Sequence, residues 1–278
     1  MGAHPGIDCH NHIIDPMRFP FAPEGGYRPQ PDEGGTKEDF AAVLGAHDMR
    51  HALLVQPSCY GTDNRAILDA VRWQPARFKA IGVLDPATPE HELEQLRAEG
   101  MLGVRFNLPF DPTALMRPTA GPFLARLKAL GWFVQVHGRD ADWAGAAPIL
   151  RRSGVRVIVD HMGLETAERG LGQPGFRSVL ALGRETDAVV KLSAFYRMSR
   201  RTPDFDDLSP FIATVIESFG ISRCVWGSDW PFLNASPRPD YDGVLTPLAR
   251  WLPNEDDRRA VLWDNPRRLF GFEQGAPT

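Results

Sequence analysis

The chain has 278 residues, of which 43% are hydrophobic and 24% charged, and its formal net charge is −4. This length suits one large domain, and a negative chain without a long basic run is a poor partner for nucleic acids or anionic membranes. The three cysteines are scattered, and the chain does not start with the basic and apolar regions of a secretion signal, so we expect a cytoplasmic protein with reduced thiols. No stretch approaches the roughly 20 apolar residues of a membrane helix.

Eight short apolar runs along the chain predict buried strands. Most are continuously hydrophobic, which is typical of parallel strands covered by helices. The runs cover residues 7–12, 52–56, 78–84, 103–107, 133–137, 155–160, 189–193 and 224–227.

Helix-like segments separate these runs. Thr36 is a plausible cap for the first, with Asp39 three residues on, and Gly100 ends the third. The later segments cover residues 63–73, 88–99, 120–130, 140–151, 175–185, 207–219 and 241–251, with closing pieces at 255–263 and 266–270. Strands alternating with helices predict an α/β fold of the (β/α)8 TIM barrel type, as one domain over residues 1–278.

The first strand ends in a way that disfavours the main rival fold, an open doubly wound sheet. That fold normally has a glycine-rich phosphate turn after its first strand. Here the strand ends in His10-Asn11-His12, and a long Pro- and Gly-rich loop follows at about residues 16–35. Long loops of this kind are often functional.

Two histidines of the first strand and an aspartate after the last strand are the strongest candidates for chemistry. His10 and His12 are two residues apart, so their side chains project to the same face of a strand. Asp229 follows the last run, and catalytic residues of such barrels lie at the carboxyl ends of the strands. Asp8 lies one layer deeper on the same face, where we expect a structural acceptor.

Other polar residues recur at the ends of the predicted strands. Arg105 lies on the fourth strand, His137 on the fifth, and His161 and Arg197 follow the sixth and seventh. For the two arginines, the alternative interpretation is an ion pair with a core carboxylate. His47, His51 and His91 fall outside these strand ends, and we expect them at the surface.

Five ordered motifs resemble the amidohydrolase superfamily, and within it the branch of 2-pyrone-4,6-dicarboxylate lactonases and related sugar-acid lactonases. The resemblance extends to the closing Asp264-Asn265-Pro266-Arg267-Arg268-Leu269-Phe270. The motifs are Asp8-x-His10-x-His12, Gly103-Val104-Arg105-Phe106-Asn107, Asp160-His161-Met162-Gly163, Lys191-Leu192-Ser193-Ala194-x-Tyr196-Arg197 and Trp226-Gly227-Ser228-Asp229-Trp230-Pro231.

The resemblance implies a role for each matching residue. Asp229 corresponds to a general base that activates water, and His10, His12 and His161 to histidines that polarise a lactone carbonyl or bind the substrate. The residues that correspond to carboxylate contacts are Arg105, Arg197, Tyr27 and Ser58, and we expect His137 to contact the substrate as well. The implied activity is hydrolysis of a small carboxylated lactone. Arginine forks suit this task because they bind carboxylates in a bidentate manner.

A histidine at position 137 departs from the metal-independent pattern of the lactonase branch and is typical of metal-dependent superfamily members. His10, His12, His137 and Asp229 are therefore a candidate site for one zinc or manganese ion. Arg105 stands where a ligand bridging two metals would be, which disfavours a two-metal centre. Without a metal, the histidines themselves must polarise the carbonyl.

Three other activities fit the same residues. They are a metal-dependent, non-oxidative decarboxylase of an aromatic or unsaturated acid, a sugar-acid lactonase, and a lactone isomerase in which a substrate hydroxyl replaces water. A non-catalytic barrel that binds an organic acid is disfavoured, because mere binding does not need a His-x-His pair together with Asp229.

Overall fold

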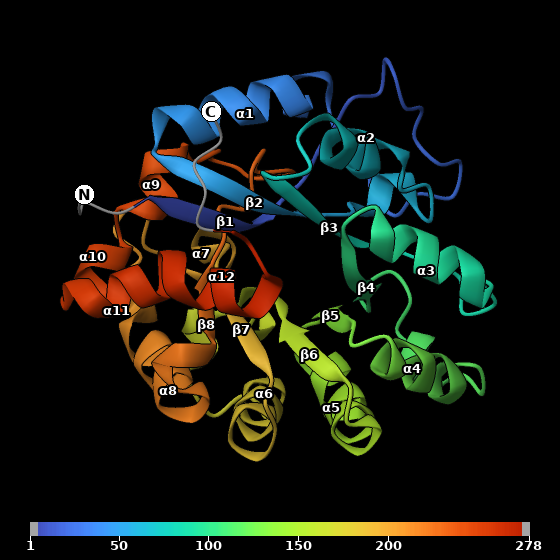
Figure 1. The fold of residues 1–278 in the computed structure, drawn as a ribbon. Coiled ribbons are helices and arrows are strands. Elements are labelled where there is room, and N and C mark those ends of the chain that lie inside the picture. The colour runs from blue at the N-terminus through green and yellow to red at the C-terminus, as the bar shows by residue number, and fades with distance from the viewer. Residues whose placement is uncertain (1–4, 274–278) are drawn as a thin grey trace.

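The computed structural model describes residues 5–273, and these form a barrel of eight parallel strands surrounded by helices (Figure 1). Each strand pairs with its neighbours in chain order, which confirms the predicted (β/α)8 fold. The strands are β1 (Gly6–Asn11), β2 (Met49–Val55), β3 (Phe78–Gly82), β4 (Met101–Asn107), β5 (Phe133–His137), β6 (Arg156–Val159), β7 (Val189–Leu192) and β8 (Cys224–Trp226).

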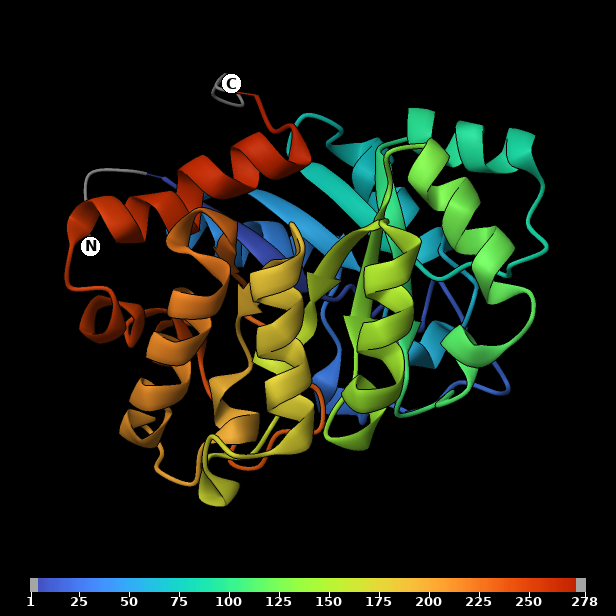
Figure 2. The same ribbon diagram turned by 90° about the horizontal axis from the view of Figure 1, so that it is seen from below.

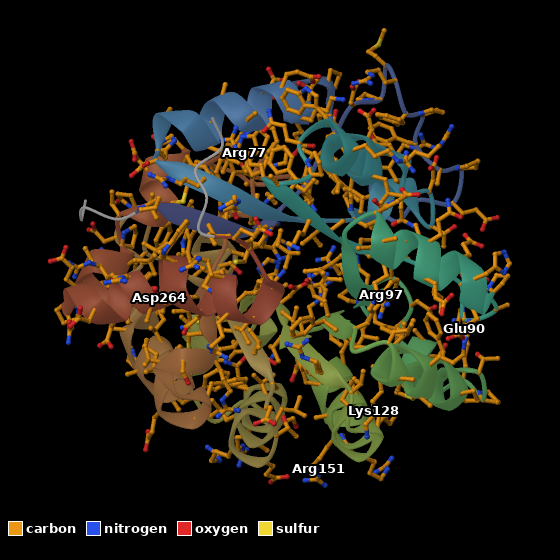
Figure 3. The ribbon with its side chains drawn as sticks, viewed as in Figure 1. Arg77, Glu90, Arg97, Lys128, Arg151 and Asp264 are labelled. Carbon is orange, nitrogen blue, oxygen red and sulfur yellow. The ribbon has the colours of Figure 1, made fainter. Side chains whose placement is uncertain are left out.

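Helices follow the strands on the outside of the barrel, and charged side chains such as Glu90, Lys128 and Arg151 lie on their outer faces (Figure 3). Within the described chain, none of the helices has the length and apolar character needed to span a bilayer. The helices are α1 (Lys37–Ala46), α2 (Arg65–Trp73), α3 (Glu90–Ala98), α4 (Ala120–Ala129), α5 (Ala141–Ser153), α6 (Pro174–Glu185), α7 (Phe195–Met198), α8 (Ser209–Phe219), α9 (Tyr241–Leu245), α10 (Leu248–Trp251), α11 (Glu255–Arg259) and α12 (Asn265–Phe270).

The barrel closes where the first strand meets the segment after the last. The amide of Asp229 donates to the carbonyl of His10 at 2.8 Å, and the amide of His12 donates to the carbonyl of Trp230 at 2.8 Å. These bonds hold the segment that contains His10 and His12 beside the segment that contains Asp229. Closure therefore places the two histidines and the aspartate at one carboxyl rim.

The opposite end of the barrel is covered by the C-terminal helices. Figure 1 shows α12 crossing in front of the strands, and Figure 2 shows the red helices lying along one end of the molecule. Phe270, Phe272 and Trp263 pack there against the barrel interior, in a cluster with Ile7 and Val225. The mouth that carries the strand-end polar residues is thus the other end.

Local signals predict most helix ends but not every helix. Thr36 caps α1, accepting from the Asp39 amide at 3.1 Å, as its sequence predicts. The segment 241–251, predicted as one helix, is instead broken into α9 and α10. The break consists of Thr246 and Pro247. Proline has no amide hydrogen to donate within a continuous helix.

His51 is a second correction. We expected a surface side chain, but His51 lies within β2 and is 2% exposed. Its ring stacks on Phe272 at 5.0 Å and on Trp263 at 5.8 Å, under the C-terminal cover. The strand begins earlier than its apolar run, at Met49, so the sequence pattern missed this residue.

Candidate active site

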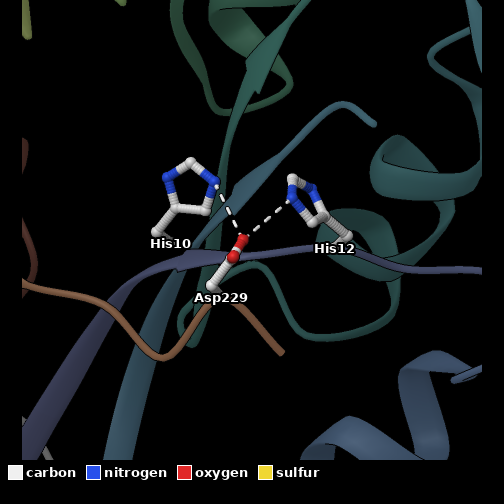
Figure 4. Close-up of side chains that lie close together, drawn as sticks. All are labelled: His10, His12 and Asp229. Carbon is white, nitrogen blue, oxygen red and sulfur yellow. Dashed lines mark ion pairs between the residues drawn. The ribbon is translucent and has the colours of Figure 1, made fainter. Parts of the chain in front are cut away.

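His10 and His12 project from the carboxyl end of β1 towards Asp229 (Figure 4). His10 Nε2 lies 3.7 Å and His12 Nε2 lies 3.5 Å from Asp229 Oδ1. The other nitrogen of His12, Nδ1, is 2.8 Å from the carbonyl of Val55. That carbonyl can only accept, so Nδ1 of His12 carries a proton, and in the neutral ring the lone pair lies on Nε2, which faces the site.

Asp229 is held by partners on one of its two carboxylate oxygens. Oδ2 accepts from the Tyr196 hydroxyl at 2.7 Å and from Arg197 Nε at 2.8 Å, while Oδ1 faces the histidines. Its backbone adopts a φ of +64°, an uncommon conformation that is concentrated at functional sites. Burial raises the pKa of Asp229, but Arg197 and the neighbouring imidazoles outweigh burial and hold the pKa well below its usual value. The carboxylate is therefore ionised.

His161 and His137 complete a row of imidazoles across the mouth. The His161 ring centroid lies 4.3 Å from that of His10 and 5.7 Å from that of His137. His161 Nδ1 is 2.8 Å from Ser193 Oγ, and His137 Nδ1 is 2.9 Å from Asn107 Oδ1. Burial lowers the pKa of His161 to about 4 and places that of His137 well below its usual value, so both rings are neutral near pH 7.

A buried charge network lies beneath the histidines. Asp160, directly after β6, accepts from Arg105 Nε at 3.0 Å and from Gln135 Nε2 at 3.0 Å. Lys191 Nζ donates to Gln135 Oε1 at 2.7 Å and lies 3.4 Å from Asp160 Oδ1. The ion pair of Arg105 with Asp160 is the alternative that the sequence left open for this arginine. Asp160 and Lys191 were not among the predicted site residues, although a lysine inside an apolar strand is itself a signal.

Arg105 also faces a cavity of about 690 Å³ beside the carboxyl ends of β2, β3 and β4. Ser58 and Asn107 line the same cavity, together with Gly26 of the loop that follows β1. A mostly apolar cavity with a few polar groups and an arginine in its wall can bind a small organic anion. Arg197 is farther round the mouth and is tied to the Leu233 carbonyl at 2.8 Å as well as to Asp229.

Tyr27, predicted as a substrate contact, lies on the loop after β1 and donates its hydroxyl to Glu33. Burial and this carboxylate raise the pKa of Tyr27 to about 12, so the phenol stays protonated. Glu33 also accepts from the Asn234 amide, which connects the first loop to the segment that follows Asp229.

Asp8 has the structural role expected of it. Its carboxylate accepts from the His10 amide at 3.0 Å, from Ser228 Oγ at 2.6 Å and from the Tyr241 hydroxyl at 3.0 Å. Burial raises the pKa of Asp8, despite these hydrogen bonds. Asp8 therefore fixes the two segments that carry His10 and Asp229.

Two groups of side chains in the described part of the chain are compact enough to hold a metal ion. One consists of His10, His12 and Asp229, and the other of His10, Asp160 and His161, with ligand atoms within 4.8 Å of one another in each. Among residues 5–273, His137 joins neither group, although the sequence placed it with the first. Three of the four predicted metal ligands are thus brought together.

Comparisons with known proteins give matches over nearly the whole chain. The family model for amidohydrolases matches residues 7–272. A 2-pyrone-4,6-dicarboxylate hydrolase of Comamonas testosteroni is 30% identical over 96% of this chain and 90% of its own length. A 4-sulfomuconolactone hydrolase of Hydrogenophaga intermedia is 30% identical over 95% of this chain and 88% of its own length.

A solved structure gives the same fold. It is a probable 2-pyrone-4,6-dicarboxylic acid hydrolase of Acinetobacter baumannii with citric acid bound. The TM-score is 0.86 and the identity 29%, over 97% of this chain and 100% of the other.

Proposed function

The chain belongs to the amidohydrolase family, and we propose that it hydrolyses a small carboxylated lactone of the 2-pyrone-4,6-dicarboxylate class. The observation that carries this proposal is the ionised Asp229, whose Oδ1 faces His10 and His12 while Arg197 and Tyr196 hold Oδ2. Relatives that act on two different carboxylated or sulfonated lactones support the reaction class.

In the proposed reaction, Asp229 takes a proton from a water molecule, and the water oxygen attacks the lactone carbonyl. An imidazole N–H beside it stabilises the oxygen on which negative charge develops. The ring carbon–oxygen bond then breaks, and the proton held by Asp229 passes to the departing ring oxygen. The carbonyl carbon becomes a carboxylic acid, which ionises to a carboxylate by releasing the second proton of the water to solvent. Atoms balance with one water consumed per ring opened.

We assign substrate binding to the arginines on either side of the imidazoles. Arg105 lines the 690 Å³ cavity together with Ser58, and Arg197 lies on the side of Asp229. Two guanidinium groups at separate points of the mouth suit a substrate with two anionic groups. Tyr27 and His137 are further proposed contacts, on the loop after β1 and at the end of β5.

The donor set fits one divalent metal, because His10 Nε2 is buried without a hydrogen-bond partner among the described residues, next to His12 and Asp229. His10, His12 and Asp229 would hold the ion, with His137 as the fourth predicted ligand. A bound zinc or manganese ion would act as a Lewis acid and lower the pKa of its water. The same cluster favours the metal-dependent decarboxylase as the second candidate function.

The test is the ultraviolet absorbance of 2-pyrone-4,6-dicarboxylate incubated with the purified protein, after chelation and after addition of zinc or manganese. Loss of the pyrone band in the wild type and not in Asp229→Asn is expected. If the band persists in every condition, this substrate is excluded, and 4-sulfomuconolactone and sugar-acid lactones are tested next. Release of CO2 from an aromatic acid, strictly dependent on metal, would replace the proposal with the decarboxylase.

A further inference from the structure

Lys191 is a buried cation for which the proposed hydrolysis has no use. It lies on β7 within the run Val189–Leu192 and is 0% exposed. Its ammonium is compensated by Gln135 Oε1 at 2.7 Å and by Asp160 Oδ1 at 3.4 Å. A buried charge is costly even when it is paired, so its third contact, His10 Nδ1 at 3.2 Å, calls for an explanation.

His10 Nδ1 has two neighbours that demand opposite positions of the imidazole proton. Lys191 Nζ can only donate, so it requires an unprotonated Nδ1 and a proton on Nε2. Asp160 Oδ1, 3.1 Å away, can only accept, so it requires the proton on Nδ1. A neutral ring can satisfy only one of the two.

The hydrogen-bond geometry favours the contact of His10 Nδ1 with Lys191 over that with Asp160. The Lys191 contact satisfies hydrogen-bonding geometry, whereas Asp160 Oδ1, despite its proximity, has no hydrogen-bond partner within the described part of the chain. An ammonium has no lone pair, so a proton on Nδ1 would point at a positive charge. His10 Nε2, on the opposite side of the ring, is also without a partner among the described residues.

We propose that Lys191 is a positioning residue that fixes His10 in the tautomer with its proton on Nε2. This N–H is then directed into the site, where it donates a hydrogen bond to the lactone carbonyl and to the oxyanion formed from it. His12 has the opposite tautomer, because its Nδ1 donates to Val55. Adjacent histidines of one strand thus supply one donor and one acceptor, and this inference rests on the proposed lactone hydrolysis.

The assignment also bears on the metal. An imidazole that binds a metal through Nε2 needs a lone pair there, and therefore a proton on Nδ1 given to an acceptor. Asp160 Oδ1 is the available acceptor, but Lys191 opposes that tautomer. Removal of Lys191 should therefore favour metal binding at His10, His12 and Asp229.

The decisive experiment is a long-range proton–nitrogen NMR spectrum of chelated, ¹⁵N-histidine-labelled protein, with His10 assigned by the signal lost in His10→Gln. We expect the wild-type His10 proton on Nε2, and in Lys191→Met on Nδ1. We also expect kcat for the lactone to fall about 10- to 100-fold in Lys191→Met with a smaller change in KM, in line with outer-shell partners of catalytic groups. Zinc affinity measured by calorimetry should rise in this variant.

Lys79→Met is the matched control, because Lys79 lies on β3 with its ammonium 5.6 Å from the Phe272 ring centroid, under the C-terminal cover. It should leave the tautomer, kcat and zinc affinity unchanged. A wild-type His10 that carries its proton on Nδ1 would overturn the inference, and this result does not depend on the folding of Lys191→Met. If no lactone is hydrolysed but the tautomer switches as expected, the inference stands and the proposed function fails.

Discussion

Acidification from about pH 7 to about pH 5 should destabilise this fold, because several imidazoles are buried in their neutral form. Burial lowers the pKa of His161 to about 4 and holds the pKa values of His10 and His137 well below the usual value. Carboxyl groups with ordinary pKa values of about 4 titrate mostly below this window. Between these two pH values the buried histidines therefore lower the stability, and buried Asp8, whose pKa is raised by burial, acts in the opposite direction.

The sign and size follow from proton binding by the two states. An unfolded histidine titrates near 6.5, so below this pH the unfolded chain binds a proton that folded His161 rejects. The stability linked to His161 is complete above about pH 6.5 and is lost as the pH falls towards 4. At about pH 5, His161 alone lowers the free energy of unfolding by about 2 kcal/mol, from roughly 1.5 pH units at about 1.4 kcal/mol each. His10 and His137 add to the loss.

Urea denaturation at both pH values, with a chelator present, measures this loss. We expect a lower midpoint at the acidic pH with an unchanged slope. His161→Gln should reduce the pH effect by about 2 kcal/mol, whereas His91→Gln, at an exposed position of α3, should leave it unchanged. Equal stability of the wild type at the two pH values would refute the assignment of neutral buried imidazoles.

Three substitutions probe other parts of the structure. Tyr196→Phe removes the 2.7 Å hydrogen bond to Asp229 Oδ2, and kcat for lactone hydrolysis should fall at least about tenfold; an unchanged kcat would contradict the orienting role. Arg105→Met leaves Asp160 without one of its buried cations and should cost about 3–5 kcal/mol in urea denaturation, and a loss below about 1 kcal/mol would argue against that ion pair. Thr36→Ala removes the cap of α1 and should lower the free energy of unfolding by about 1 kcal/mol, measured by thermal melting against the partly exposed Thr214→Ala as control.

Hydrophobic pattern was sufficient to predict the barrel. Each predicted strand corresponds to an observed one because parallel strands covered by helices are apolar on both faces. The local sequence pattern gave a wrong prediction where contacts with residues distant in the sequence determine burial. His51 is polar by type, yet Trp263 and Phe272, more than two hundred residues away, cover it. Pro247 interrupts a segment whose apolar spacing alone favours one helix.

The candidate site likewise has one part that could be predicted from the sequence and one part that could not. His10, His12 and Asp229 could be predicted to converge, because barrel closure brings the first strand beside the last. The network of Asp160, Lys191 and Gln135 could not be predicted, because its contacts depend on how residues of β5, β6 and β7 are aligned across the sheet. No motif in a single segment records that alignment, and a lone lysine in an apolar strand indicates only that some partner exists.

Asp160 and Asp229 both lie beside His10, but their different surroundings give the two carboxylates different roles. Asp160 is fully buried and is surrounded by Lys191, Arg105 and Gln135. Asp229 has its charged partner on Oδ2 only, and Oδ1 lies 3.5 and 3.7 Å from the imidazole nitrogens, which is longer than an ordinary hydrogen bond. Protein donors therefore do not saturate Oδ1. A water molecule can lose its proton to this oxygen, whereas Asp160 is engaged by two buried cations, Lys191 and Arg105.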